Sequence, residues 1–153
     1  MSFAVKVLVA GDAGLLSSVA DGVFDNPVDP QLSAEFLNDP RHHIAVAIEA
    51  GLVVGFASGV DYIHPDKPRE LWINEVGVAP SHRRQGVGHA VLAALLETAR
   101  RLGCSSAWVL TDRSNNAAIA LYGSLGGASG IEGASEAIVG FEFKFVGDDL
   151  LHA

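Results

Sequence analysis

The tightest limit on the fold comes from residues 71–102, which read LWINEVGVAPSHRRQGVGHAVLAALLETARRL. An apolar, strand-like run ends at Val78, a short polar loop follows, and Arg83-Arg84-Gln85-Gly86-Val87-Gly88 opens a long helical pattern. Glycines in such a loop let the backbone approach an anion, and the first turn of a helix offers unpaired N–H groups and a positive dipole end. The stretch therefore predicts a strand, a phosphate-binding loop and a helix.

Length and composition limit the class of protein. A chain of 153 residues predicts one domain, residues 1–153, with its own core. No apolar run approaches the ~18 residues of a membrane span, and no signal pattern opens the chain, so we expect a cytoplasmic protein that does not act in a membrane. The single cysteine, Cys104, excludes an internal disulfide and fits a reducing compartment.

The charge of the chain is acidic and unevenly distributed. The formal net charge is −8, which argues against nucleic-acid binding because neutralising phosphates needs a basic surface. Residues 1–40 contain six acids and one lysine, whereas two arginines lie in the loop of the opening stretch. This balance is compatible with a cationic partner.

Hydrophobic periodicity predicts an α+β chain. The helices are expected to begin at Asp12, at Asp29-Pro30, at Gly86, and after Ser114 or Asn115, each of which offers a cap, a first-turn proline or a glycine turn. The strands are expected at residues 3–9, 44–48, 52–63, 71–78, 105–111 and 137–146, with a glycine-rich connector at 126–133.

This order of elements, taken with two motifs, resembles the GNAT acetyltransferase superfamily. The motifs are R-x-x-G-x-G at residues 83–88 and N-x-x-A-x-x-L-Y at residues 115–122. The resemblance covers roughly Phe3 to Gly126. It implies a GNAT fold with a mixed, mostly antiparallel sheet of six to seven strands flanked by about four helices.

Within that superfamily the chain looks most like the GNAT-type aminoglycoside 3-N-acetyltransferases. The similar stretches are Tyr62-Ile63-His64-Pro65, the strand Glu70–Val78, His82–Gly86, and Asp112 followed by Asn115–Gly126. The chain departs from the superfamily pattern at Gly127, where an aromatic residue is usual, and in a connector of small residues.

The resemblance implies acetyl-CoA as the co-substrate. Its pyrophosphate is expected on the amides of Arg84 to His89, and its pantetheine arm and acetyl carbonyl on the backbone of Val76 and Val78, where the fourth and fifth strands splay apart. Gly77 is expected to permit a bulge there. The implied cofactor-binding residues are Val76, Gly77, Val78, Arg83, Arg84, Gln85, Gly86, Val87, Gly88, His89, Asn115 and Tyr122.

Two residues are candidates for proton transfer. The resemblance implies that Tyr122 protonates the departing CoA thiolate, although its helical face also suits a packed aromatic ring with a satisfied hydroxyl. If its strand is regular, Glu75 shares a face with Leu71 and Ile73, and such apolar surroundings raise the pKa of a carboxyl. Glu75 could then be a general base, an anchor for a cationic substrate or a structural partner of an arginine.

Two further positions carry open alternatives. Asp112 could anchor the substrate or lie in a surface turn, and Asn115 could cap a helix, contact the cofactor or do both. The six histidines show no metal-ligand spacing, so no metal site is expected. The phenylalanines at 141–145 suit either a core face or a homodimer contact.

The resulting prediction is an N-acetyltransferase in which the amine attacks acetyl-CoA directly in a ternary complex. The acceptor favoured is a small cationic amine, an aminoglycoside acetylated at the 3-N position. The alternatives are a protein lysine, a protein N-terminus or a polyamine as acceptor, and a non-catalytic CoA-binding module.

Overall fold

The computed structural model describes residues 2–130 and 135–145. Hydrogen bonding joins seven strands in the order β1-β2-β3-β4-β5-β7-β6. The chain divides into two compact units, Met1–Val60 with Asn74–Leu95 (unit 1) and Asp61–Ile73 with Leu96–Ala153 (unit 2). The predicted α+β class and the mixed sheet are confirmed.

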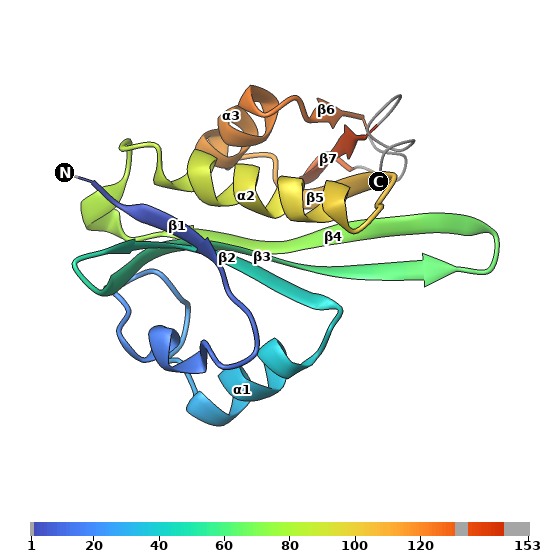
Figure 1. The fold of residues 1–153 in the computed structure, drawn as a ribbon. Helices are drawn as coiled ribbons and strands as arrows, with labels where there is room; N and C mark the ends of the chain where they lie inside the picture. Colours follow the sequence, from blue (N-terminus) through green and yellow to red (C-terminus); the bar gives the residue numbers. More distant parts are fainter. Residues whose placement is uncertain (1, 131–134, 146–153) are drawn as a thin grey trace. The chain divides into compact units, whose positions relative to one another are not determined.

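The elements follow the chain as in Figure 1. They are β1 (Ala4–Val7), η1 (Ala13–Ser17), α1 (Pro30–Asn38), β2 (His42–Glu49), β3 (Leu52–His64), β4 (Lys67–Val78), η2 (Pro80–His82), α2 (Val87–Arg101), β5 (Ser106–Asp112), α3 (Asn116–Ser124), β6 (Ala128–Ser129) and β7 (Ile138–Lys144). β6 lies in the predicted glycine-rich connector, whose residues 131–133 fall outside the described part. Val146, the last residue of the predicted final strand, also falls outside it.

Unit 1 is built on an antiparallel meander. β1 pairs with β2, and β2 pairs with β3 across a two-residue turn. Ala50 at φ 51° and Gly51 at φ 80° give this turn two positive φ values, as in the type I′ turns that match the twist of a hairpin. The hairpin predicted from alternating apolar residues is therefore confirmed.

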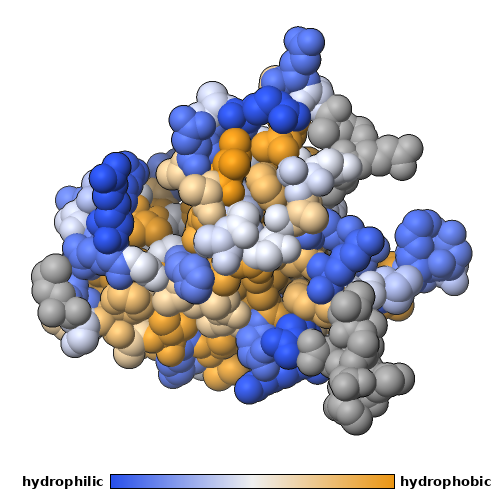
Figure 2. Space-filling model, turned by 90° about the horizontal axis from the view of Figure 1, so that it is seen from above, coloured by the Kyte–Doolittle hydropathy of each residue, from blue (hydrophilic) through white to orange (hydrophobic). Residues whose placement is uncertain are grey.

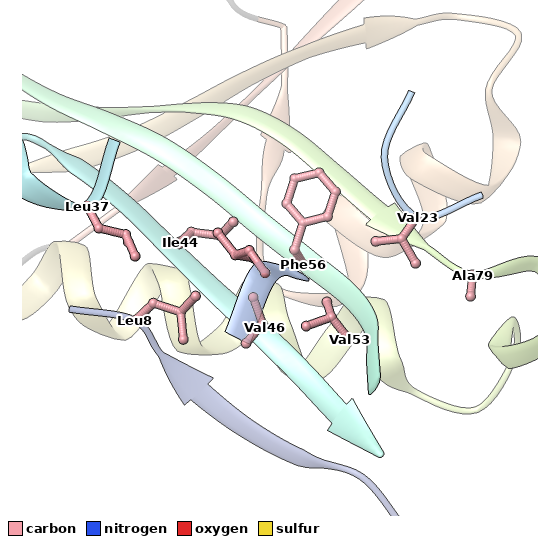
Figure 3. Packing of buried hydrophobic residues seen from close by; sticks show 9 residues of the cluster. Leu8, Val23, Leu37, Ile44, Val46, Val53, Phe56 and Ala79 are labelled. Carbon is pink, nitrogen blue, oxygen red and sulfur yellow. The ribbon is translucent and has the colours of Figure 1, made fainter. Parts of the chain in front are cut away.

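A cluster of apolar side chains fills the space between this meander and the N-terminal segments. Figure 3 shows the side chains of β2 and β3 converging with Leu8, Val23 and Leu37. Val46 and Val53 are fully buried, and Phe56 stacks on Phe24 with ring centroids 4.2 Å apart. This core holds the segment between η1 and α1 against the sheet.

The helix predicted to follow Asp12 is wrong. Only Ala13–Ser17 is helical, as a 3-10 turn, and the chain then runs extended beside the start of β3. Ala20 N–H donates to the Val53 carbonyl, and Val53 N–H donates to the Ser18 carbonyl. Hydrogen bonds to β3 therefore replace the helical hydrogen bonds that the apolar spacing suggested. About four helices were expected, and the described residues contain three α-helices.

α1 begins as predicted. Asp29 is the N-cap, and its carboxylate accepts hydrogen bonds from the N–H groups of Gln31 (2.8 Å) and Leu32 (2.9 Å). Pro30 occupies the first helical position, where no N–H is needed. The cap fixes the direction in which the preceding loop, residues 18–28, enters the helix.

Unit 2 contains the start of β4, the strands β5 to β7, and α3. β4 pairs in parallel with β5 over Glu70–Trp72, and β5 pairs antiparallel with β7 along its whole length. Phe141, Phe143 and Phe145 are buried within the chain. The predicted phenylalanine row is therefore a core face and offers no apolar surface to a second copy.

The surface mixes apolar and charged residues. Figure 2 shows hydrophobic side chains lying between hydrophilic ones on one face of the molecule. None of the helices in residues 2–130 and 135–145 has the length and apolar character needed to cross a lipid bilayer.

Candidate active site

The loop before α2 has the backbone of an anion site. Arg84 at φ 62° and Gly86 at φ 81° both adopt the left-handed region, which turns the chain sharply into the helix. The first helical hydrogen bond runs from Ala90 N–H to the Gly86 carbonyl at 3.0 Å. The amides of residues 87–89 therefore precede that bond and have no partner within the helix.

The side chains of this loop agree with its backbone. Arg83 and Arg84 are exposed, and neither has an ion-pair partner among the described residues. A Cβ placed on Gly86 would meet no atom within 4 Å, so the space above the loop is open. Free amides, two uncommitted guanidinium groups and open space fit a diphosphate.

A partly buried contact that the sequence did not reveal supports this loop. His82 Nε2 pairs with the Glu49 carboxylate, and His82 Nδ1 lies 2.8 Å from Ser81 Oγ. His82 and Glu49 are 33 positions apart, so no spacing motif could have joined them. The pair ties the segment before the loop to the end of β2.

The second half of β4 lies in unit 1, beyond its ladder with β5, which covers Glu70–Trp72. Val76, Gly77 and Val78 are partly exposed. A Cβ on Gly77 would overlap the Val23 carbonyl oxygen and lie 2.7 Å from the Phe56 ring. Glycine at 77 therefore permits a close approach of two segments.

Glu75 lines a cavity of about 370 Å³ in unit 1. The apolar part of its lining comes from the loop before α1, from α1 and from β2 and β3; it includes Phe24, Val28, Leu32, Phe36, Ile44 and Phe56. Burial raises the pKa of the Glu75 carboxyl, as predicted, and the neighbouring Asp25 carboxyl raises it further through its charge and a hydrogen bond. Glu75 itself remains exposed, at the rim of the cavity.

Asp25 is the residue near Glu75 that the sequence did not single out. It follows Phe24, lies 50 positions before Glu75 and lines the same cavity. Its only signal in the sequence was its membership of the acidic N-terminal segment. The predicted alternative of an arginine partner for Glu75 finds no support in this lining, which contains no arginine.

Tyr122 belongs to unit 2, where it is 6% exposed. Its ring packs against Phe141 and Phe143, with centroids 5.5 Å and 6.5 Å away. Burial raises the pKa of its phenol. Within the described residues the hydroxyl has no hydrogen-bond partner, so the ring is packed but the hydroxyl is not satisfied.

The two remaining candidates of unit 2 have ordinary local roles. Asn115 is the N-cap of α3, and its side-chain oxygen accepts from the Ala118 N–H at 3.0 Å. Capping uses only the oxygen, so the amide NH₂ is left for another partner. Asp112 is the last residue of β5 and is exposed. Its backbone carbonyl accepts a hydrogen bond from Asn115 N–H in the turn that follows.

Unit 2 also explains the glycine at position 127. A Cβ there would lie 2.8 Å from both the Phe143 ring and the Tyr122 carbonyl oxygen. Phe143 of β7 therefore occupies the space into which a larger residue would extend.

Unit 2 holds one further polar network that the sequence did not reveal. Tyr62 accepts a hydrogen bond from Trp108 Nε1 and donates one to Glu70 at 3.2 Å.

Cys104 and the histidines of the described residues show no sign of metal or nucleophilic chemistry. Within residues 2–130 and 135–145, no group of three or more histidine, cysteine or acidic side chains is arranged to hold a metal ion. Burial, followed by the charge of Asp61, raises the pKa of the Cys104 thiol to about 11. At neutral pH this thiol is therefore protonated and a poor nucleophile.

Comparisons of sequence and of structure find known proteins that this chain resembles. The model of the acetyltransferase (GNAT) family matches residues 16–126. N-alpha-acetyltransferase RimI of Mycobacterium tuberculosis is 36% identical over 124 residues, which are 80% of this chain and 76% of that protein.

Two solved structures are similar in fold. The ribosomal-protein-S18-alanine N-acetyltransferase of Escherichia coli superposes with a TM-score of 0.66 at 22% identity, covering 96% of this chain and 97% of the other. An aminoglycoside acetyltransferase from an uncultured soil metagenomic sample superposes with a TM-score of 0.67 at 25% identity, covering 82% of this chain and 91% of the other.

Proposed function

The chain belongs to the GNAT family of acetyltransferases, and from this premise we propose that it transfers an acetyl group from acetyl-CoA to the α-amino group of a protein N-terminus. The observation that carries the choice of acceptor is the 36% identity, over 80% of the chain, to a protein named as an N-alpha-acetyltransferase. A protein N-terminus is one of the alternative acceptors predicted from the sequence, and the comparisons favour it over an aminoglycoside.

The proposed chemistry assigns one task to each group. Acetyl-CoA, when bound, supplies the thioester from which the acetyl group leaves. The amides of residues 84–89 and the two arginines hold its diphosphate, and the backbone of Val76 and Val78 orients its arm and polarises the acetyl carbonyl. Asn115 contributes its free NH₂.

Two proton transfers complete the reaction. Glu75 takes a proton from the ammonium acceptor, directly or through water, so that a neutral amine attacks. Its raised pKa, caused first by burial and then by Asp25, makes it a better base than an ordinary carboxylate. Tyr122 donates its proton to the departing sulfur, and its raised pKa keeps it protonated at neutral pH.

An acceptor panel tests the proposal. Purified protein and acetyl-CoA are offered short peptides with a free N-terminus, the same peptides with a blocked N-terminus and one internal lysine, an aminoglycoside and a polyamine. We expect thiol release only with free N-termini, and fragment-ion mass spectrometry should locate the acetyl group on the α-nitrogen. Faster release with the aminoglycoside or the blocked peptides would overturn the choice of acceptor and leave the acetyltransferase chemistry in place.

An aminoglycoside at its 3-amino group is the second candidate acceptor. Two observations favour it: the fold similarity to an aminoglycoside acetyltransferase at 25% identity, and the acidic lining beside Glu75. The same panel separates the two acceptors, because both are cationic but only peptides carry an α-amine next to an amide.

A further inference from the structure

The cavity beside Glu75 contains a polar side chain that has no evident structural task. Ser58 lies on β3, opposite Ile44 of β2, and it is 7% exposed. Among the described residues its hydroxyl has no hydrogen-bond partner, although its residue lines the cavity. The hydroxyl oxygen itself keeps accessible surface, so a ligand in the cavity can reach it and donate a hydrogen bond to it.

The strand geometry places Ser58 and Glu75 on one side of the sheet. A Cβ on Gly77 would contact the Phe56 ring at 2.7 Å, so Gly77 and Phe56 face the same side. Ser58 lies two residues after Phe56 on β3, and Glu75 two residues before Gly77 on β4. Because alternate residues of a strand share a face, Ser58 and Glu75 face that side too.

The charges that face this cavity are all negative. Asp25, Asp29 and Glu75 are the ionisable residues of its lining, and the stretches of α1, β2 and β3 that border it contribute none. Asp29 is committed to the α1 cap, whereas Asp25 is engaged with Glu75. No cation within the lining neutralises the Asp25–Glu75 pair.

We propose that Asp25, Glu75 and Ser58 form a three-acceptor site for the ammonium group of the substrate, with the apolar cavity holding the carbon atoms attached to it. The inference rests on the proposed function and deepens it, since it concerns the amine of the same reaction. An ammonium group has three N–H donors and no acceptor, which matches two carboxylates and a hydroxyl oxygen. Ser58 then gains the partner that it lacks.

The site also sets the order of proton movement. One ammonium N–H bond breaks, its proton moves to the Glu75 carboxylate, and the electron pair stays on nitrogen as the neutral amine. Asp25 accepts a hydrogen bond from the newly formed carboxylic acid of Glu75. Asp25 is therefore a positioning residue, which acts on the reaction through Glu75.

The first experiment follows Glu75 itself and requires no acceptor. The protein carries ¹³C-labelled glutamate side chains, Glu75→Gln identifies the Glu75 carboxyl signal, and NMR follows that signal against pH. In Asp25→Asn the signal should titrate at lower pH than in wild type, because the like charge is gone. An unchanged titration in a folded variant overturns the carboxyl pair, whatever the acceptor proves to be.

The second experiment measures ammonium capture with the best amine of the acceptor panel. Because hydrogen bonds to charged groups are strong, we expect KM to rise about tenfold in Asp25→Asn and about threefold in Ser58→Ala, with the ascending limb of kcat/KM moved to lower pH in Asp25→Asn alone. Glu35→Gln is the control: it also removes one negative charge, from the exposed side of α1, and should change neither quantity.

The outcomes separate this inference from the proposed function. If Asp25→Asn and Ser58→Ala melt like wild type but keep its KM, the ammonium site is wrong even where peptides are good substrates. If the best amine is an aminoglycoside and both variants raise its KM, the protein N-terminus is wrong and the ammonium site stands. An equal rise of KM in Glu35→Gln would mean that the rise follows from the net charge of the protein, and it would overturn the ammonium site.

Discussion

At the scale of single residues, the most informative contrast lies between two tyrosines of unit 2. The Tyr122 hydroxyl has no partner within the described residues, whereas the Tyr62 hydroxyl accepts from Trp108 and donates to Glu70. A hydroxyl that bonds within the protein contributes to stability. One that does not is available for chemistry, which is why these two side chains should respond differently to the same substitution.

Tyr122→Phe should lower kcat by about 10²-fold and leave the melting temperature nearly unchanged, because it removes the proton donor and breaks no hydrogen bond. Steady-state kinetics and thermal unfolding check both parts. Tyr62→Phe is the matched control and should lower the melting temperature with little effect on kcat. Equal kcat values for Tyr122→Phe and wild type would exclude the phenol as the acid.

The candidate residues could be predicted from the sequence where a motif gave them a fixed spacing or, for Glu75, where the alternation of a strand gave it a face. The loop arginines and glycines, Asn115 and Tyr122 were found in this way. Asp25 and Ser58 were not, because their relation to Glu75 depends on a loop folding against one strand and on β3 lying beside β4. No local pattern records such contacts between segments far apart in the chain.

At the scale of elements, the first two predicted helices show when a helix can be predicted from its own sequence and when it cannot. α1 was found because Asp29-Pro30 is a start signal that acts on its own backbone. The helix after Asp12 was wrong because the segment found hydrogen bonds on β3 and because Gly22, at φ 79°, packs where a Cβ would lie 2.8 Å from Pro80. Apolar spacing alone could not reveal either contact.

Asp29→Ala should destabilise the protein by about 1 kcal/mol, because two helical N–H groups lose their acceptor. For a chain of this length that corresponds to a fall of about 2–4 °C in melting temperature, measurable by circular dichroism. Asp29→Asn should stay close to wild type, since an asparagine oxygen also caps. A fall of the same size in Asp29→Asn would mean that the charge, and not the cap, is what α1 requires.

At the scale of the whole molecule, the net charge of −8 coexists with a loop that offers two arginines to an anionic ligand. Under the proposed function, the acidic remainder favours a cationic acceptor, while the loop is a local exception whose charge suits a diphosphate. Fields of this kind act through water and are therefore sensitive to salt.

The KM of a basic peptide acceptor should consequently rise with salt between about 0.01 M and 0.15 M, as the Debye length falls from about 30 Å to 8 Å. The measurement is thiol release at several sodium chloride concentrations. A peptide with the same N-terminus and glutamines in place of its lysines is the control and should respond much less. An equal response of both peptides would locate the attraction at the N-terminal ammonium alone.

The division of the chain into units has a consequence for how the protein is made. Unit 1 takes its second segment from residues 74–95, and unit 2 takes its first from residues 61–73, so the two are interleaved along the sequence. During synthesis all of unit 1 has been translated once residue 95 is added. Residues 61–73 have by then been translated too, but the rest of unit 2, residues 96–153, has not. Splitting the coding sequence at any one position therefore cannot give two fragments that each encode a whole unit.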